Sequence, residues 1–152
     1  MKRVACLVLL LFAVALCVGC TAPTETVTYT STAKIRLDLP RSDVDDLIGI
    51  YLINDVDGLF KSDAVLLNVI ESEKLSCSAK ELSSMIRVQR ASETENVYLV
   101  SVDASLANDA ARIANAVAVE FCDKVNRVDS PNGMEEPVAE VLEKATAPTA
   151  PK

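Results

Sequence analysis

The chain has 152 residues, a formal net charge of −7 and no histidine. This length suits one compact domain, and the negative charge disfavours binding to nucleic acid, whose phosphates repel an acidic surface. The absence of histidine removes the usual general base near neutral pH and the commonest metal ligand. We therefore predict a non-catalytic protein that holds no metal or other cofactor. Because aromatic residues make up only 4% of the chain, we expect a core of aliphatic side chains rather than rings.

Residues 1–19 have the three parts of an export signal. Lys2 and Arg3 form a short basic region, an apolar run covers residues 4–18, and Gly19-Cys20 follows it. The run is shorter than the roughly 20 residues that a membrane-spanning helix needs. The segment Leu16-Cys17-Val18-Gly19-Cys20 resembles the bacterial lipobox, in which the final cysteine is lipidated and becomes the new N-terminus. We predict a lipid anchor on Cys20; an uncleaved membrane helix and ordinary secretion are the alternatives. In each case the rest of the chain is expected to face the extracytoplasmic side of the cell membrane.

The next part of the chain is predicted to hold a strand followed by three helical pieces. Residues 20–26 form a short polar tether, and residues 27–39 alternate between apolar and polar positions, which is typical of a half-buried strand. Three N-cap signals follow, at Ser42, Ser62 and Ser78. We expect Gly58 to interrupt the first helical stretch, and the third helix to end at about residue 84.

The remainder of the domain is predicted to hold two strands, a long helix and a last strand. Residues 85–90 and 97–103 form strands joined by the short polar connector 91–96. An apolar face of Leu106, Ala110, Ile113, Val117 and Phe121 predicts an amphipathic helix over residues 106–126. A weaker strand follows at residues 138–142, and the Pro-rich tail 146–152 is expected to be extended and mobile. The element order βα(α)ββαβ predicts an α+β, ferredoxin-like sandwich, with one sheet of about four strands covered by helices.

Two cysteines lie in the predicted domain, Cys77 before the third helix and Cys122 near the end of the long one. In an exported protein they could form a disulfide; the alternative is two free thiols. A metal site on them is not expected, because no histidine or third soft ligand accompanies them. Asp55-Val56-Asp57-Gly58 contains alternating acids but lacks the ligand spacing of a calcium loop, so we expect solvated acids at a helix break.

Several segments resemble one family when taken together. They are Tyr29–Ile35, Lys61–Val65 with Val69-Ile70, Leu75–Leu82 with Ile86–Val88, Val100–Asp103 with Ala110–Val117, and the proline-spaced Ala145–Pro151. In this combination they are similar to the polysaccharide chain-length determinant family, which includes the Wzz-type co-polymerases and the modulators of bacterial tyrosine kinases. Ala107 stands where the family usually has proline, and the long outward helical insertion of many members is missing. A lipobox-like signal takes the place of the first membrane helix.

The resemblance implies that residues 27–145 correspond to the extracytoplasmic base domain of that family alone. Its members have no catalytic residues and are thought to regulate glycan length by oligomerising beside a polymerase. The resemblance therefore implies an accessory role in capsule, exopolysaccharide or O-antigen biosynthesis. The expected partners are copies of this chain, full-length chain-length determinant proteins or the polysaccharide polymerase. The alternative is a binding lipoprotein that uses the same fold for another ligand.

Overall fold

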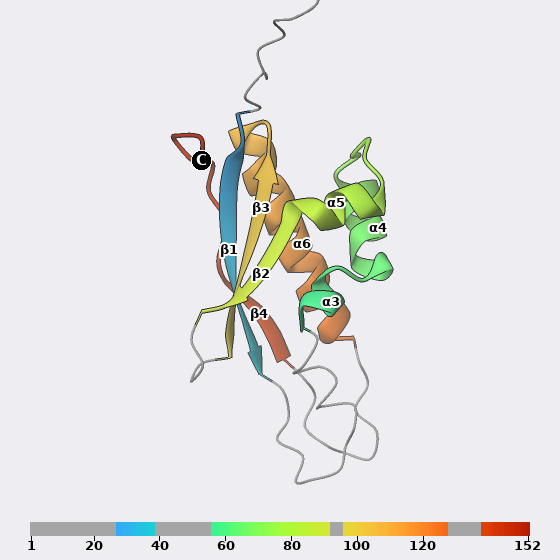
Figure 1. Ribbon diagram of the computed structural model, residues 1–152. Coiled ribbons are helices and arrows are strands. Elements are labelled where there is room, and N and C mark those ends of the chain that lie inside the picture. Colours follow the sequence, from blue (N-terminus) through green and yellow to red (C-terminus); the bar gives the residue numbers. More distant parts are fainter. Residues whose placement is uncertain (1–26, 39–55, 92–95, 128–137) are drawn as a thin grey trace, which may run out of the picture.

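A computed structural model describes residues 27–38, 56–91, 96–127 and 138–152 (Figure 1). Four strands form one antiparallel sheet in the order β2-β3-β1-β4. The strands are β1 (Tyr29–Asp38), β2 (Ile86–Arg90), β3 (Val97–Ala104) and β4 (Val138–Glu143). Consecutive strands β2 and β3 pair with each other, and the first and third strands occupy the centre of the sheet.

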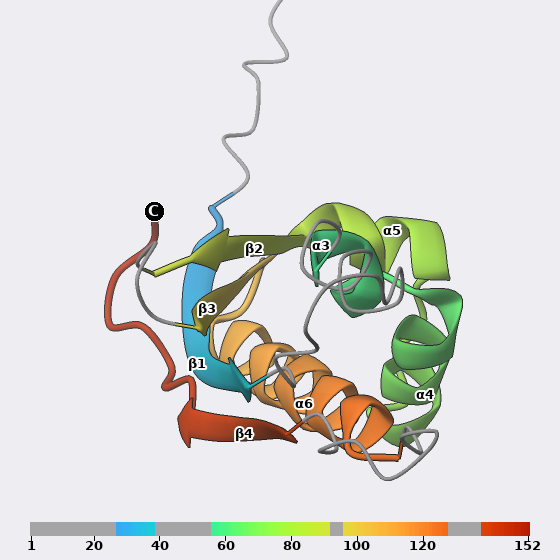
Figure 2. The same cartoon turned by 90° about the horizontal axis from the view of Figure 1, so that it is seen from below.

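The described helices lie on one face of this sheet. They are α3 (Val56–Phe60), α4 (Asp63–Ser72), α5 (Ala79–Met85) and α6 (Ala107–Val125). Figure 2 shows α6 between the sheet and α4, with α3 and α5 beside β2. The predicted α+β sandwich, one antiparallel sheet covered by helices, is confirmed. None of the described helices is both long enough and apolar enough to cross a bilayer.

The alternation in β1 decides which face of the sheet is covered. Ala33, Ile35 and Leu37 are buried beneath the helices, while Thr32 and Arg36, at alternate positions, are exposed. Successive side chains on a strand point to opposite faces, so the apolar positions lie on one side. The predicted strand is therefore confirmed, but it covers Tyr29–Asp38 rather than residues 27–39.

The predicted N-cap at Ser78 is confirmed in detail. Its hydroxyl accepts a hydrogen bond from the backbone N–H of Glu81, and the Glu81 carboxylate accepts one from the Ser78 backbone N–H at 2.7 Å. This reciprocal pair is a capping box. The hydrogen bonds from the Ser78 backbone and hydroxyl hold the pKa of Glu81 below its ordinary value. Ser62 also precedes a helix, α4, but its side chain makes no capping hydrogen bond.

Two expectations about helix boundaries are wrong. Gly58 does not break a helix, because it lies inside α3, and the chain turns instead at Lys61 and Ser62. Leu106 is not on the buried face of the long helix: it is the N-cap residue of α6 and is 60% exposed. The helix predicted to start at Ser42 lies outside the described residues.

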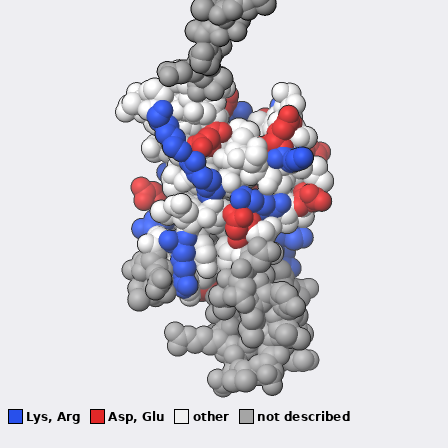
Figure 3. Space-filling model, in the orientation of Figure 1, with Lys and Arg blue, Asp and Glu red and all other residues white. Residues whose placement is uncertain are grey.

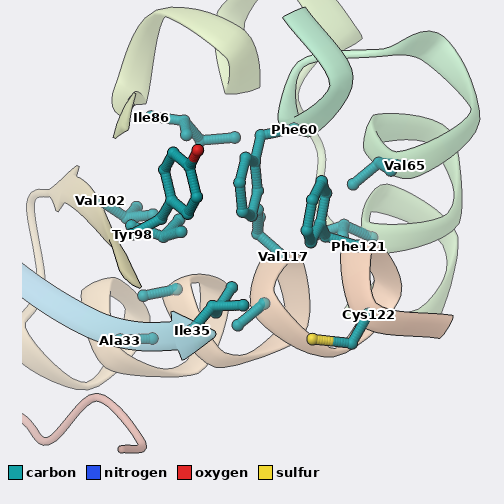
Figure 4. Packing of buried hydrophobic residues seen from close by; sticks show 14 of the residues in the cluster. Ala33, Ile35, Phe60, Val65, Ile86, Tyr98, Val102, Val117, Phe121 and Cys122 are labelled. Carbon is teal, nitrogen blue, oxygen red and sulfur yellow. The ribbon is translucent and has the colours of Figure 1, made fainter. Parts of the chain in front are cut away.

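The core is largely aliphatic, but two rings lie at its centre. Phe60 of α3 and Phe121 of α6 are almost fully buried and stack with their ring centroids 3.6 Å apart (Figure 4). The expectation of a core without rings is therefore wrong at this point. Stacked pairs add about 0.5–1.5 kcal/mol to the burial of the rings themselves. The contact explains how a five-residue helix that contains glycine is held in place.

Replacing Ile113 with Asp is expected to unfold the domain. Ile113 is 4% exposed and belongs to the core cluster, so the substitution buries an unpaired charge at a cost of several kcal/mol. Total stabilities of about 5–15 kcal/mol leave little margin for that loss. The matched control is Asn108→Asp, at an exposed position of the same helix. Circular dichroism melting of residues 27–152 should show a large loss for the first variant only; equal melting temperatures would contradict this packing.

Candidate functional site

The start of β1 and the tail that follows β4 meet at one end of the sheet. We call it the proximal end and define it by Thr28, Ala104 and Lys152. Tyr29 pairs with Ala104, and the backbone N–H of Lys152 donates to the carbonyl of Thr28 at 2.8 Å. The Lys152 ammonium also lies 3.8 Å from the carboxylate of Asp103, which in turn pairs with Arg87 at 2.9 Å. Helix α6 begins just after Ala104, so it too starts at the proximal end and runs away from it.

The tail that follows β4 lies beside the first half of β1 (Figure 1). Ser31 is 4% exposed, and its hydroxyl donates to the carbonyl of Thr146 at 2.5 Å. Together with the contact between Lys152 and Thr28, this hydrogen bond joins the tail to β1 at two points. The composition of residues 146–152 predicts an extended, mobile tail and gives no sign of these contacts.

Two asparagines of the α6 segment hold β4 in place. The Asn126 side chain donates to the carbonyl of Ala139 at 3.0 Å and accepts from its N–H at 2.8 Å. Asn115 makes the same pair of hydrogen bonds with Ala145, at 2.9 and 2.8 Å. Each amide thus engages both backbone polar groups of one residue, as a neighbouring strand would. The two amides fix β4 against α6 just inside its start and just beyond its end.

A groove follows the solvent-facing side of α6, with the end of α4 as one wall and β4 as the other. It has a volume of about 440 Å³. We call it the α6–β4 groove and define it by its lining residues: Ser72, Glu73, Arg112, Asn115, Ala116, Val119, Glu120, Val141 and Lys144. Its centre is apolar, and Val119 is 44% exposed there although it is a large aliphatic residue. The rim carries charges of both signs.

The charges on the rim of the groove are not equally satisfied. Arg112 contacts the carboxylates of Glu73 and Asp109, and these hydrogen bonds raise the pKa of its guanidinium. Glu120 accepts a hydrogen bond from the neutral side chain of Asn68 at 3.1 Å and makes no ion pair with the described residues. Lys144 is exposed and also makes no ion pair there. One acid and one base in the groove therefore lack a charged partner within the described part of the chain.

The uncovered face of the sheet is polar and largely satisfied by its own residues. Thr32 and Ser101 share a hydrogen bond of 2.8 Å across β1 and β3. Arg36 pairs with Glu140 at 2.5 Å, and Arg87 pairs with Asp103. Such cross-strand pairs are typical of the solvated side of an antiparallel sheet. Figure 3 likewise shows basic and acidic side chains interspersed over the visible face of the described residues.

Most of the site residues predicted from the sequence do not come together. Cys20 lies outside the described residues. Cys77 and Cys122 are both free thiols, half-buried and buried respectively. Asp57 is exposed and pairs with Lys61 at 2.9 Å. The described residues contain no group of three or more His, Cys, Asp or Glu side chains that could hold a metal ion.

The groove and the roles of the two asparagines could not be predicted from the sequence. A polar residue within an apolar helical pattern, as at Asn115 in Ile113–Val117, was the available signal, but its partner Ala145 lies 30 residues away. Lys144 and Val119 carry no local signal, because a single exposed lysine or valine is common on any surface.

Replacing Asn115 with Ala should weaken the attachment of β4. The N–H of Ala145, a residue only 7% exposed, would lose its partner at a cost of about 1–3 kcal/mol. The matched control is Asn108→Ala, at an exposed position of the same helix, where the gain in helix propensity is similar. Urea unfolding and hydrogen exchange at the Ala145 amide would measure the difference; equal effects of the two substitutions would contradict the proposed role of the Asn115 amide.

The buried thiol of Cys122 predicts a fall in stability at alkaline pH. Burial, followed by the charges of Asp123 and Glu140, raises the pKa of Cys122 to about 11, whereas a thiol in an unfolded chain has a pKa of about 8.5. Between these values the unfolded chain has lost a proton that the folded chain keeps, so the free energy of unfolding should fall as the pH rises. Urea midpoints between about pH 8 and 11 should fall less steeply in Cys122→Ala than in wild type. Parallel slopes would count against the shifted pKa.

Comparison with known proteins gives one partial similarity. No family model matches the chain. Over 79 residues, 52% of its length, the chain is 35% identical to the "Probable capsular polysaccharide biosynthesis protein YwqC" of Bacillus subtilis (strain 168). The aligned segment covers 32% of that protein, so the chain corresponds to about a third of the relative that it matches.

Proposed function

We propose that this chain is a membrane-anchored, non-catalytic accessory module of cell-surface polysaccharide biosynthesis, which acts by protein association to regulate chain length or assembly. The observation that carries this proposal is the similarity of about half the chain to a probable capsular polysaccharide biosynthesis protein. The family-like segments found in the sequence, which extend from residue 29 to residue 151, support the same role. The partners are further copies of the chain, full-length chain-length determinant proteins or the polymerase.

The position of the proximal end is consistent with a lipid anchor at Cys20. Six residues, 21–26, separate the domain from the anchor at Cys20, and the seven extended steps from Cys20 to residue 27 reach about 25 Å at most. An anchored domain therefore stays close to the bilayer with its proximal end toward it. The α6–β4 groove and the sheet then face sideways, toward neighbours on the same membrane. Confinement to one surface raises the effective concentration of partners, so weak contacts suffice.

The length distribution of the surface polysaccharide is the measurement that tests this role. Deletion of the gene should shift or broaden the distribution, and the wild-type gene should restore it. Cys20→Ser, exported through an ordinary signal peptide, should not restore it, because the domain is then released from the membrane. The matched control is Cys77→Ser, which keeps the anchor and should complement.

Labelling with a fatty-acid probe separates failure of the anchor from failure of the function. The probe should mark the wild type and Cys77→Ser but not Cys20→Ser. Equal labelling of all three would remove the lipid anchor from the proposal. An unchanged amount and length of polysaccharide on deletion, in a strain with no related gene, would overturn the assembly role and favour the binding lipoprotein.

A further inference from the structure

The α6–β4 groove is a concave surface that combines an apolar centre with charged residues on both walls. In the groove, Glu120 and Lys144 make no ion pair with the described residues, and Val119 is exposed between them. Ala116 next to Val119 is small, so a partner can approach the α6 backbone closely. An apolar centre with a polar rim is the usual composition of a protein interface.

The two unmatched charges lie on opposite sides of the groove. Glu120 is on the α4 side, where it meets Asn68, and Lys144 directly follows β4 on the other side. A two-fold axis that runs along the groove, parallel to α6, would place the α4 wall of one copy against the β4 wall of the other. Each Lys144 would then face the Glu120 of the second copy, so the groove is complementary to itself in charge.

The heights of these two residues along α6 also match. Ala145 is level with Asn115, to which it is hydrogen-bonded. Glu120 lies five residues beyond Asn115, which is about 7.5 Å along the helix axis at 1.5 Å per residue. Lys144 precedes Ala145 by one extended residue and therefore lies about 3.3 Å from it in the same direction. The remaining offset of about 4 Å is within the reach of a lysine side chain. Val119 lies between the two pairs, close to the axis.

We propose that the α6–β4 groove is the surface through which two copies of this chain associate, about a two-fold axis parallel to α6. This inference rests on the proposed function in one respect, the anchoring of each copy near its proximal end. Because α6 runs away from the proximal end, an axis parallel to α6 places both anchors on the same side, as one membrane requires. The proposed association would thus take place through the α6–β4 groove, and its partner would be a second copy of this chain.

Disulfide cross-linking of the full-length chain in membranes tests the axis. Val119→Cys places a thiol beside the two-fold axis, where the same residue of both copies meets, and mild oxidation should produce a covalent dimer. The matched control is Leu67→Cys, at a residue of α4 that is 55% exposed and does not line the groove. The wild type measures any background from the native cysteines. Cross-linking of Val119→Cys that does not exceed the Leu67→Cys level would overturn the proposal.

Charge reversal tests the pairing between Lys144 and Glu120. In the Val119→Cys background, Lys144→Glu or Glu120→Lys alone places like charges opposite each other in both contacts and should lower the dimer yield by about tenfold. The double variant restores opposite charges and should return the yield to near its starting value. Recovery supports the pairing, and no recovery in a double variant with an unchanged melting temperature overturns it.

The outcomes separate this inference from the proposed function. A changed polysaccharide on deletion, without cross-linking through position 119, would leave the function standing and remove this surface. Cross-linking with charge-dependent recovery, but no effect of deletion on the polysaccharide, would leave the dimer standing and remove the glycan role.

Discussion

The structure depends on the packing of α6 against the sheet, since this helix contacts the two central strands, the β4 edge, α3 and α4. Ala110, Ala114 and Ala118 are almost fully buried on α6, and small side chains let a helix approach a sheet closely. Phe121 of the same helix stacks on Phe60 and so holds α3, while Asn115 and Asn126 hold the strand on the opposite flank. One helix therefore joins the central strands, α3, α4 and the β4 edge, while α5 packs on α4, β2 and β3.

Features encoded by local sequence could be predicted, and features that join distant residues could not. The alternation of β1 and the capping box at Ser78 involve neighbours in the chain, and both are confirmed. At Gly58 the local signal misled, because tertiary packing of Phe60 on Phe121 outweighs the poor helix propensity of glycine. The amide pairs at Asn115 and Asn126 link residues 30 and 13 positions apart, and the groove arises only when α4, α6 and β4 come together. The lipid anchor at Cys20 stays a prediction.

The proposed function requires only weak contacts between neighbouring copies on a membrane. The small apolar content of the α6–β4 groove agrees with contacts of that strength. Among the described residues, the α6–β4 groove has one exposed valine, one unpaired acid and one unpaired base, which is far from the large apolar interface of an obligate dimer. On a membrane, weak contacts of this kind can form and separate as partners diffuse. A regulator of polymer length benefits from that reversibility, because an assembly that never dissociates could not respond to its partners.

The side-chain amides of Asn115 and Asn126 also limit how the β4 edge can pair with a strand from another chain. An edge strand normally presents open N–H and C=O groups that can recruit a strand from another chain. At Ala139 and Ala145 these groups are already bonded within the chain, so side-chain amides occupy the places where a foreign strand would begin to pair. At these two residues of the β4 edge, contacts with another chain are thereby left to side chains rather than to strand pairing.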